Sequence, residues 1–236
     1  NDLLRNTYQH GQYRAFYVFD PKPRHIHKAS VRDRLLHHAV YRILYPFFEK
    51  TFIADSFSCQ LGKGTHRAIN RFRDFAYKVS QNNTRTCWIL KCDIKKFFNN
   101  IDHEILLSIL EGYIPDKKII YLLKNIIDSF STQLSKGLPL GNLTSQLFVN
   151  VYMNEFDQFV KHKLKAKYYI RYADDFVIIF NDHEELKDLI SKIKDYLVKK
   201  LKLEIHPRKI LIKTLVSYYM QMFYSKSIQK ALLILK

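Results

Sequence analysis

The hydrophobic positions of this chain follow two patterns that alternate along the sequence. Apolar residues recur every three or four positions in six stretches, which predicts amphipathic helices. These stretches are 36–47, 68–79, 105–110, 119–130, 148–160 and 186–201. Shorter apolar runs rich in Tyr, Ile, Val and Phe predict strands. These runs are 87–98, 167–180 and 203–205. Residues 1–28 are polar, basic and aromatic, and we expect extended structure with short strand pieces. The pattern as a whole predicts an α+β fold.

Polar residues indicate where several of these helices begin. Ser30, followed by an Asp three residues later, is similar to a capping box. Thr65 is a good N-cap, and Asp102 and Asp182 can cap the helices that follow them. Pro46 should kink or end the first helix.

The stretch 167–180, KYYIRYADDFVIIF, predicts two apolar strands joined by a tight turn at 172–175. Asp174 and Asp175 are adjacent in this turn, and each resists ionising beside the other unless a cation or strong hydrogen-bond donors compensate. The usual cation for paired carboxylates is Mg²⁺, which prefers oxygen ligands. The alternative is a simple polar turn, since Asp is common in turns.

A third carboxylate changes the balance between these alternatives. Asp93 lies within the apolar run 87–98, and such a carboxylate needs a partner. If this run and the hairpin are neighbours in one antiparallel sheet, the three carboxylates meet at one point. Three carboxylates can hold two Mg²⁺ ions roughly 4 Å apart, the arrangement used for phosphoryl displacement.

Two loops are candidates for ligand contact, each with an ordinary alternative. Lys63 lies in a glycine-containing loop before a helix, where it could contact a phosphate or belong to a solvated basic face. The loop 136–146, KGLPLGNLTSQ, contains two glycines that let backbone approach a ligand closely, or it is a plain loop-to-helix junction.

Composition and charge narrow the class of partner. The 236 residues are enough for one large domain or two interlocked subdomains, and the 47% hydrophobic content indicates a globular protein. The net charge of +17 suits a polyanion, either nucleic acid or an anionic membrane surface. The sequence has no run that could span a bilayer and no secretory pattern, so we expect nucleic acid and no membrane. Three cysteines without metal-ligand spacing indicate free thiols in a reducing compartment.

Several motifs together resemble those of reverse transcriptases. RYADDFVIIF resembles their catalytic hairpin, and LKCDIKKFFNNIDHEIL resembles their first catalytic motif. KPRHIHKASVRDRLLHHAV and DSFSCQLGKGTHRAI resemble finger motifs of the bacterial enzymes. The loop KGLPLGNLTSQLFVNVYMNEFDQFVK looks most like the enzymes of diversity-generating retroelements, whereas group II intron and retron enzymes usually carry Gln-Gly in place of Leu140–Gly141–Asn142. The resemblance covers residues 24–212.

The resemblance implies roles for individual residues. Asp93 and Asp174 would be the main metal ligands, Asp175 a supporting ligand, and Ile94 would offer its backbone carbonyl to the metal. The cofactor would be two Mg²⁺ ions, for which Mn²⁺ can substitute. Phe98 would lie under the nucleotide sugar and exclude a 2′-hydroxyl; the alternative is a core aromatic. The other residues implied in nucleotide binding are Lys63, Leu140, Gly141 and Asn142, with Arg24, Gln146 and Lys209 as further candidates.

The resemblance also implies a right-hand polymerase core of fingers and palm, with an antiparallel palm sheet flanked by helices and the thumb absent or truncated. We expect fingers at 1–86, a palm strand with the first catalytic Asp at 87–102, helices of the fingers and palm at 103–136, the palm with the hairpin at 137–213, and an altered or truncated tail at 214–236. The partners would be an RNA template, a DNA or RNA primer, deoxynucleoside triphosphates and a small basic accessory protein. A cytoplasmic enzyme of bacterial, archaeal or phage origin is expected.

Two departures from the family pattern affect the expected activity. Gln60 stands where relatives usually have Arg, which weakens the expected grip on the triphosphate. After LEIHPRKI, the family's primer-grip strand and helical thumb are replaced by LVSYYMQMFYSKSIQKALLILK, in which Tyr218, Tyr219, Met222 and Phe223 could pack on the palm. From this tail we expect a chain that binds nucleic acid but extends a primer poorly.

Three functions remain open at this point. The first is RNA-directed DNA synthesis by the reverse transcriptase of a diversity-generating retroelement, which copies a template-repeat RNA with errors at adenines. The second is a group II intron or defence-type bacterial reverse transcriptase. The third is a non-catalytic nucleic-acid-binding remnant of such an enzyme, which Mg²⁺-dependent primer extension would distinguish from the other two.

Overall fold

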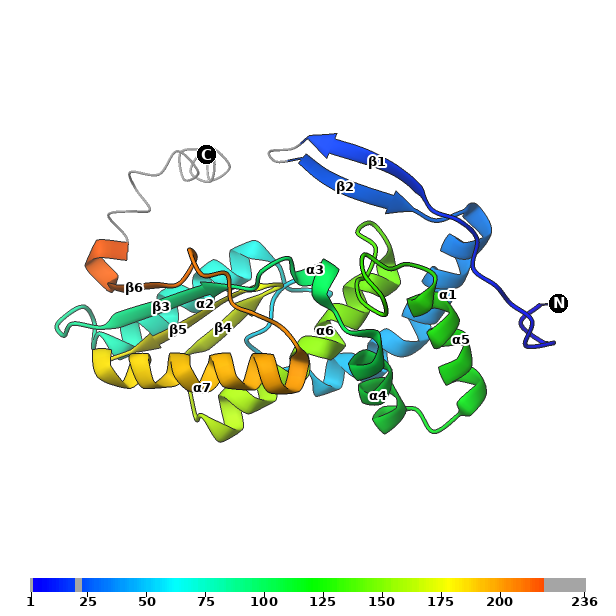
Figure 1. Cartoon of the computed structure of the whole chain (residues 1–236). Helices are drawn as coiled ribbons and strands as arrows, with labels where there is room; N and C mark the ends of the chain where they lie inside the picture. The colour runs from blue at the N-terminus through cyan, green and yellow to red at the C-terminus, as the bar shows by residue number, and fades with distance from the viewer. Residues whose placement is uncertain (1, 20–22, 219–236) are drawn as a thin grey trace. The chain divides into compact units, whose positions relative to one another are not determined.

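The chain divides into two compact units in the computed structural model, which describes residues 2–19 and 23–218 (Figure 1). The first unit comprises Asn1–Ala54, Lys95–Phe159 and Tyr196–Glu204, and the second comprises Asp55–Ile94, Val160–Asp195 and Ile205–Lys236. The range 1–86 that the sequence predicts as fingers therefore contributes to both units, as does the range 137–213 predicted as palm.

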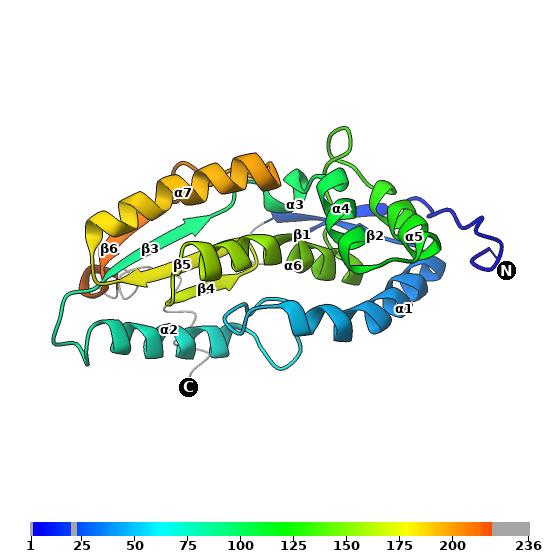
Figure 2. The same cartoon turned by 90° about the horizontal axis from the view of Figure 1, so that it is seen from below.

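The second unit is built on a four-stranded sheet. Its strands are β3 (Trp88–Asp93), β4 (Tyr169–Tyr172), β5 (Asp175–Phe180) and β6 (Leu211–Thr214), in the order β4-β5-β3-β6. All three strand pairs are antiparallel. The helix α2 (Thr65–Val79) covers one face of this sheet, and α7 (His183–Leu201) begins on the opposite face (Figure 2). The predicted antiparallel sheet flanked by helices is confirmed.

The α2 face of the sheet carries an apolar core. Alternate residues of β3 and β5, such as Ile89 and Ile179, are fully buried and pack with Phe75 and Ala76 of α2. Leu215, just after β6, joins the same cluster. Burial of each large apolar side chain in this cluster stabilises the fold by about 1.5–3 kcal/mol. This core holds the strand ends in fixed register, which matters for the site described below.

The first unit is mainly helical. Its elements are the hairpin β1 (Arg14–Phe19) and β2 (Pro23–Lys28), α1 (Val31–Phe48), η1 (Glu49–Thr51), α3 (Phe97–Asn100), α4 (His103–Tyr113), α5 (Lys117–Asp128), α6 (Leu143–Gln158) and the end of α7. Helix α6 packs against α1 and α4, and α4 also packs against α5. The π-helical turn η2 (Phe159–Lys163) follows α6. No helix in the described part of the chain is long and apolar enough to cross a membrane.

Most of the predicted helix starts are confirmed. Ser30 accepts a hydrogen bond from the Asp33 N–H, and Asp102 accepts one from the Ile105 N–H. Asp182 likewise accepts from the two N–H groups at 184 and 185. The prediction for Thr65 was wrong: Thr65 is the first residue of α2, and its hydroxyl donates to Tyr172 Oη instead of capping the helix. Helix α1 continues two residues beyond Pro46 before it ends.

Three further expectations about strands differ from the structure. The apolar run 87–98 forms a strand only as far as Asp93, because the chain then turns into α3. The predicted strand 203–205 is reduced to a single bridge between Ile205 and Ile94. Residues 211–214, for which no strand was predicted, form β6 and pair with β3. The expected packing of Tyr219, Met222 and Phe223 concerns residues outside those that the structure describes.

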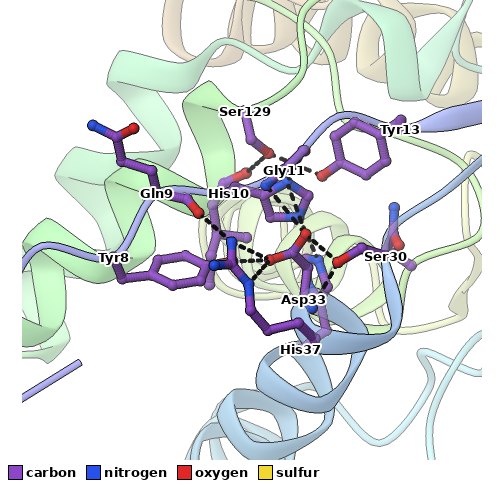
Figure 3. A network of polar contacts seen from close by, with 12 residues as sticks. Tyr8, Gln9, His10, Gly11, Tyr13, Ser30, Asp33, His37 and Ser129 are labelled. Carbon is purple, nitrogen blue, oxygen red and sulfur yellow. Dashed lines mark hydrogen bonds and ion pairs between the residues drawn. The ribbon is translucent and has the colours of Figure 1, made fainter. Parts of the chain in front are cut away.

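A buried carboxylate holds the N-terminal segment of the first unit to α1 (Figure 3). Asp33 has no exposed surface and accepts hydrogen bonds from Tyr8 Oη at 2.9 Å, Ser30 Oγ at 2.6 Å and the Gly11 N–H at 3.1 Å. Burial by itself would raise the pKa of Asp33, but the hydrogen bonds from Ser30 and Tyr8, together with His10, outweigh it and lower the pKa to about 2. The ionised form of Asp33 is therefore built into the fold.

A pair of histidines continues this network toward α6. His37 Nε2 lies 3.0 Å from His10 Nε2, and His37 Nδ1 lies 2.6 Å from Thr144 Oγ1. Burial and the neighbouring His10 lower the pKa of His37 to about 4, although Asp33 partly opposes the shift. A neutral His37 is therefore the form that this packing favours at neutral pH.

Candidate active site

The three predicted catalytic carboxylates meet at one corner of the four-stranded sheet. Asp93 is the last residue of β3 and pairs in register with Asp175, the first residue of β5. Asp174 lies in the turn between β4 and β5, and its backbone carbonyl accepts a hydrogen bond of 3.1 Å from the Ile94 N–H. Asp93 and Asp175, which are 82 positions apart in the sequence, are therefore neighbours because β3 and β5 are adjacent strands. We call Asp93, Asp174 and Asp175 the carboxylate corner.

The turn that presents Asp174 has a strained backbone supported by a buried arginine. Ala173 has a φ of 54°, a conformation that costs free energy in residues other than glycine. Arg171, which has no exposed surface, donates from Nη1 to the Ala173 carbonyl at 3.0 Å. Sequence reasoning did not assign a role to Arg171. The signal was available, because an arginine within the apolar run YYIRY must find a partner when it is buried.

Burial and neighbouring negative charges both raise the pKa of Asp174. Burial is the largest influence and raises its pKa, Asp175 and Asp93 raise it further, and the backbone N–H of Asp174 and the Lys209 ammonium act in the opposite direction. The carboxylate corner therefore favours a cation, or a proton, at Asp174.

Two lysines compensate the other two carboxylates. Lys209 Nζ lies 2.7 Å from Asp93 Oδ2, and Lys91 Nζ lies 3.8 Å from Asp175 Oδ1. The Asp93 side chain is 13% exposed and that of Lys209 is 51% exposed, so this ion pair joins a nearly buried carboxylate to a half-exposed cation. The hydrogen bond to Asp93 raises the pKa of Lys209 and keeps it charged.

The donor chemistry of the corner fits a hard divalent cation, but the side chains are not arranged as a ready-made cage. Carboxylate oxygens are the ligands that Mg²⁺ prefers. Among the residues that the structure describes, no three His, Cys, Asp or Glu side chains are grouped so that they could share a metal ion. Asp93 instead binds the Lys209 ammonium at 2.7 Å. A metal ion that used the Asp93 carboxylate would have to compete with Lys209.

A groove of about 320 Å³ adjoins the corner on the α2 face of the sheet. Its walls are mostly apolar and include Phe72 of α2, Val177 of β5 and Tyr218. The Phe72 and Tyr218 rings lie 5.7 Å apart, measured between their centroids. Asp175 forms part of its lining, so the groove opens beside the carboxylates.

Lys63 is the other predicted site residue in the second unit. It lies in the loop before α2, where its ammonium donates to the Ser56 carbonyl at 2.8 Å and lies 5.7 Å from the centre of the Phe57 ring. Gln60, which stands at the expected arginine position, is buried and donates to the same carbonyl at 3.1 Å. The structure therefore shows this loop held together by its own polar contacts.

The remaining predicted nucleotide-binding residues belong to the first unit. The Leu140 carbonyl accepts from the His27 N–H at 2.9 Å, and Asn142 Nδ2 donates to the His27 carbonyl at 3.2 Å. Gly141 has a φ of 106°, and a Cβ at this position would lie 2.7 Å from Ile26 Cγ2. The glycine was expected to let backbone approach a ligand, and in this structure the close approach is to β2.

Three more candidates also belong to this unit. Phe98 lies in α3, after the chain has turned out of β3, and its carbonyl accepts a hydrogen bond from the Leu138 N–H at 2.8 Å. Gln146 lies in the first turns of α6, and Arg24 is exposed on β2. Their proposed contacts with a nucleotide remain predictions.

The sheet and its flanking helices have the arrangement of the right-hand polymerase fold, with the acidic corner at the end of two neighbouring strands. The chain belongs to the reverse transcriptase (RNA-dependent DNA polymerase) family, whose model matches residues 20–229. This confirms the family that the sequence motifs indicated.

Individual relatives share the family at low identity. Protein YkfC of Escherichia coli (strain K12) is 24% identical over 218 residues, which cover 76% of this chain and 57% of YkfC. The group II intron-encoded protein LtrA of Lactococcus lactis subsp. cremoris is 27% identical over 203 residues, which cover 81% of this chain and 32% of LtrA. The chain therefore spans only about a third to somewhat over half of the length of these two proteins.

Solved structures confirm the fold. The apo telomerase of Candida tropicalis superposes with a TM-score of 0.64 over 87% of this chain and 45% of the telomerase, at 13% sequence identity. The telomerase of the same organism in complex with a TWJ fragment of telomeric RNA gives the same TM-score at 12% identity, over 87% of this chain and 41% of that one. At this level of identity the similarity concerns the fold.

Proposed function

We propose that this chain catalyses RNA-directed DNA synthesis, the addition of a deoxynucleotide to a primer 3′-hydroxyl opposite an RNA template. The observation that carries the proposal is the meeting of Asp93, Asp174 and Asp175 at one corner of an antiparallel sheet. Family membership supports the reaction, because the family is that of RNA-dependent DNA polymerases.

Each residue of the corner has a distinct part in this proposal. Asp93 and Asp174 hold the metal ions, with Asp175 and the Ile94 carbonyl in support. When bound, two Mg²⁺ or Mn²⁺ ions lower the pKa of the primer hydroxyl and neutralise charge on the triphosphate. Arg171 holds the turn in the conformation that presents Asp174, through its hydrogen bond to the Ala173 carbonyl.

The incoming deoxynucleoside triphosphate would be bound by residues outside the corner. In our proposal Lys63 contacts the triphosphate and Phe98 excludes a 2′-hydroxyl beneath the sugar. The loop Leu140–Gly141–Asn142 borders the nucleotide, with Arg24, Gln146 and Lys209 as further contacts. The primer–template is a polyanion, and the net charge of +17 supports its binding.

Two subtypes of reverse transcriptase are supported by different observations. The Leu140–Gly141–Asn142 sequence supports a diversity-generating retroelement enzyme, which copies a template-repeat RNA with errors at adenines beside a small basic accessory protein. The similarity to LtrA supports a group II intron-type enzyme. Sequencing the DNA made on a defined RNA template separates the two, since only the first predicts misincorporation concentrated at template adenines.

Primer extension with matched variants tests the main proposal. We expect Mg²⁺-dependent extension by the wild type and loss of extension in Asp93→Asn and in Asp174→Asn. Asp188→Asn, the same chemical change at an exposed position of α7, is the control and should extend normally. Near-normal extension by either corner variant would refute the assignment. Tight primer–template binding by a wild type that does not extend would favour the non-catalytic remnant.

A further inference from the structure

The segment that carries Lys209 is attached to the carboxylate it neutralises. The His206 N–H donates to the Asp93 carbonyl at 2.8 Å, and the Lys209 N–H donates to the His206 carbonyl at 2.9 Å. The Lys209 side chain then reaches back to Asp93 Oδ2 at 2.7 Å. Backbone and side chain of residues 206–209 therefore converge on one residue at the end of β3.

The ammonium occupies a place where a cation is required. Asp93 lies beside Asp174 and Asp175, and three carboxylates in one corner repel each other unless positive charge compensates them. All three carboxylates attract the Lys209 ammonium. Asp93 raises the pKa of Lys209 most, and Asp175 and Asp174 raise it further. Like a metal ion, a lysine ammonium is a compact positive charge, although it is attached to the chain by a flexible stem.

The same contact is easily released. The Lys209 side chain is 51% exposed, so the ammonium can move into water, and the nearly buried Asp93 carboxylate that it leaves is then available to another cation. Solvent screens the exposed lysine side of this ion pair, and holding a flexible lysine side chain in one geometry costs conformational entropy. Arg171 differs, since it is fully buried and donates to the backbone of the turn.

We propose that the Lys209 ammonium is a tethered counter-cation that neutralises the carboxylate corner in the metal-free protein, and that divalent-metal binding displaces it from Asp93. The inference rests on the proposed function, which requires metal ions at this corner. It adds that metal entry is an exchange of one cation for another, so that Lys209 lowers the apparent affinity for metal while it stabilises the empty corner.

Direct metal titration of the full chain tests this exchange. Free Mn²⁺ is measured by electron paramagnetic resonance as it is added to the wild type, to Lys209→Met and to Lys187→Met. Lys187 is the matched control, because it is 52% exposed, forms an ion pair of 2.9 Å with Glu184 and loses the same charge. We expect Lys209→Met to bind Mn²⁺ on the order of fivefold more tightly than both the wild type and the control.

A second measurement is the melting temperature of the metal-free protein. In a chelator, Lys209→Met should melt at a lower temperature than the wild type, and its melting temperature should rise more on addition of Mn²⁺. Lys209→Gln, whose amide can still donate to Asp93 without a charge, provides the same comparison if the Met variant fails to fold. Unchanged or weaker Mn²⁺ binding in the variant that folds would overturn the proposal, as would an equal gain in Lys187→Met.

Primer extension on the same samples separates this inference from the proposed function. Extension by the wild type together with unchanged Mn²⁺ affinity in Lys209→Met would overturn the role of Lys209 and leave the polymerase activity standing. Tighter Mn²⁺ binding by Lys209→Met in a chain whose wild type does not extend primers would support the role of Lys209 and count against the polymerase.

Discussion

Replacing Asp174 with Asn should stabilise the metal-free protein, although it should abolish primer extension. Burial and the carboxylates of Asp175 and Asp93 raise the pKa of Asp174 in the folded state. A carboxyl whose pKa is raised by folding contributes stability below its unfolded pKa and loses that contribution as the pH rises through its folded pKa. Folding therefore disfavours the ionised form of Asp174, and Asn removes the cost of holding that charge.

The expected magnitude follows from the contacts of each carboxylate. Removing one charge from beside two like charges at a partly exposed site should raise the free energy of unfolding by about 1 kcal/mol. Asp93→Asn relieves similar repulsion, but it also loses the charge of the 2.7 Å contact with Lys209. A charge-assisted hydrogen bond contributes about 1.5 kcal/mol at the low end. We therefore expect Asp93→Asn to lie within about 0.5 kcal/mol of the wild type.

Urea unfolding of chelator-treated protein measures this difference. At pH 7 we expect Asp174→Asn to melt roughly 2–4 °C above the wild type in a parallel thermal scan. The gain should shrink as the pH is lowered, since the wild-type carboxyl then takes up its proton. Asp188→Asn is the control and should stay within about 0.5 kcal/mol of the wild type. The reasoning is wrong if Asp174→Asn is no more stable than Asp93→Asn at pH 7, or if its gain does not depend on pH.

Three other outcomes are expected from the structure and the proposed function. Phe98→Ala should raise ribonucleotide incorporation relative to deoxynucleotide incorporation by roughly 10- to 200-fold, measured as a ratio of kcat/KM values, and an unchanged ratio would leave Phe98 as a core aromatic. Because folding lowers the pKa of His37 from its ordinary 6.5 to about 4, its contribution to stability is present above pH 6.5 and is lost as the pH falls through 4. The free energy of unfolding of the wild type, measured with urea, should therefore fall by up to about 3 kcal/mol as the pH is lowered, and by less in His37→Gln. An equally large fall in the variant would show that His37 is not its cause. Affinity for a primer–template should fall about a thousandfold or more between 50 and 200 mM salt, as expected for six or more phosphate contacts, whereas a flat response would show that the +17 charge serves another purpose.

Local sequence patterns were sufficient for much of the fold. The runs of Tyr, Ile, Val and Phe on both sides of the turn identified the hairpin, and the polar residue Ser30 located the start of α1 correctly. The partnership of Asp93 with the hairpin was predicted from the cost of a carboxylate within an apolar strand, and the register Asp93↔Asp175 agrees with it. These features depend on a few neighbouring residues or on one strong energetic requirement, so a single sequence contains enough information.

Other features depend on contacts that no local pattern indicates. Lys209 lies 116 positions from Asp93, and the sequence indicated it only as a candidate for nucleotide binding. The strand β6 is not strongly alternating, and it forms because β3 offers a free edge beside it. Thr65 had the chemistry of an N-cap, but its hydroxyl bonds to Tyr172 on the neighbouring strand, a tertiary contact that overrides the local preference.

The distribution of cations around the carboxylate corner explains why its three acids behave differently. Asp93 has Lys209 and Asp175 has Lys91, each within ion-pair distance. Asp174 has a raised pKa, and the ammonium that lowers it most is the one bound to Asp93. When all three carboxylates are ionised, these two lysines of the described chain face three negative charges, and the difference of one charge is centred on the residue that the strained turn presents. A divalent cation has more charge than that single deficit requires. Its binding is consequently favoured most when a lysine withdraws, and of the two lysines Lys209 makes the closer contact with a proposed metal ligand.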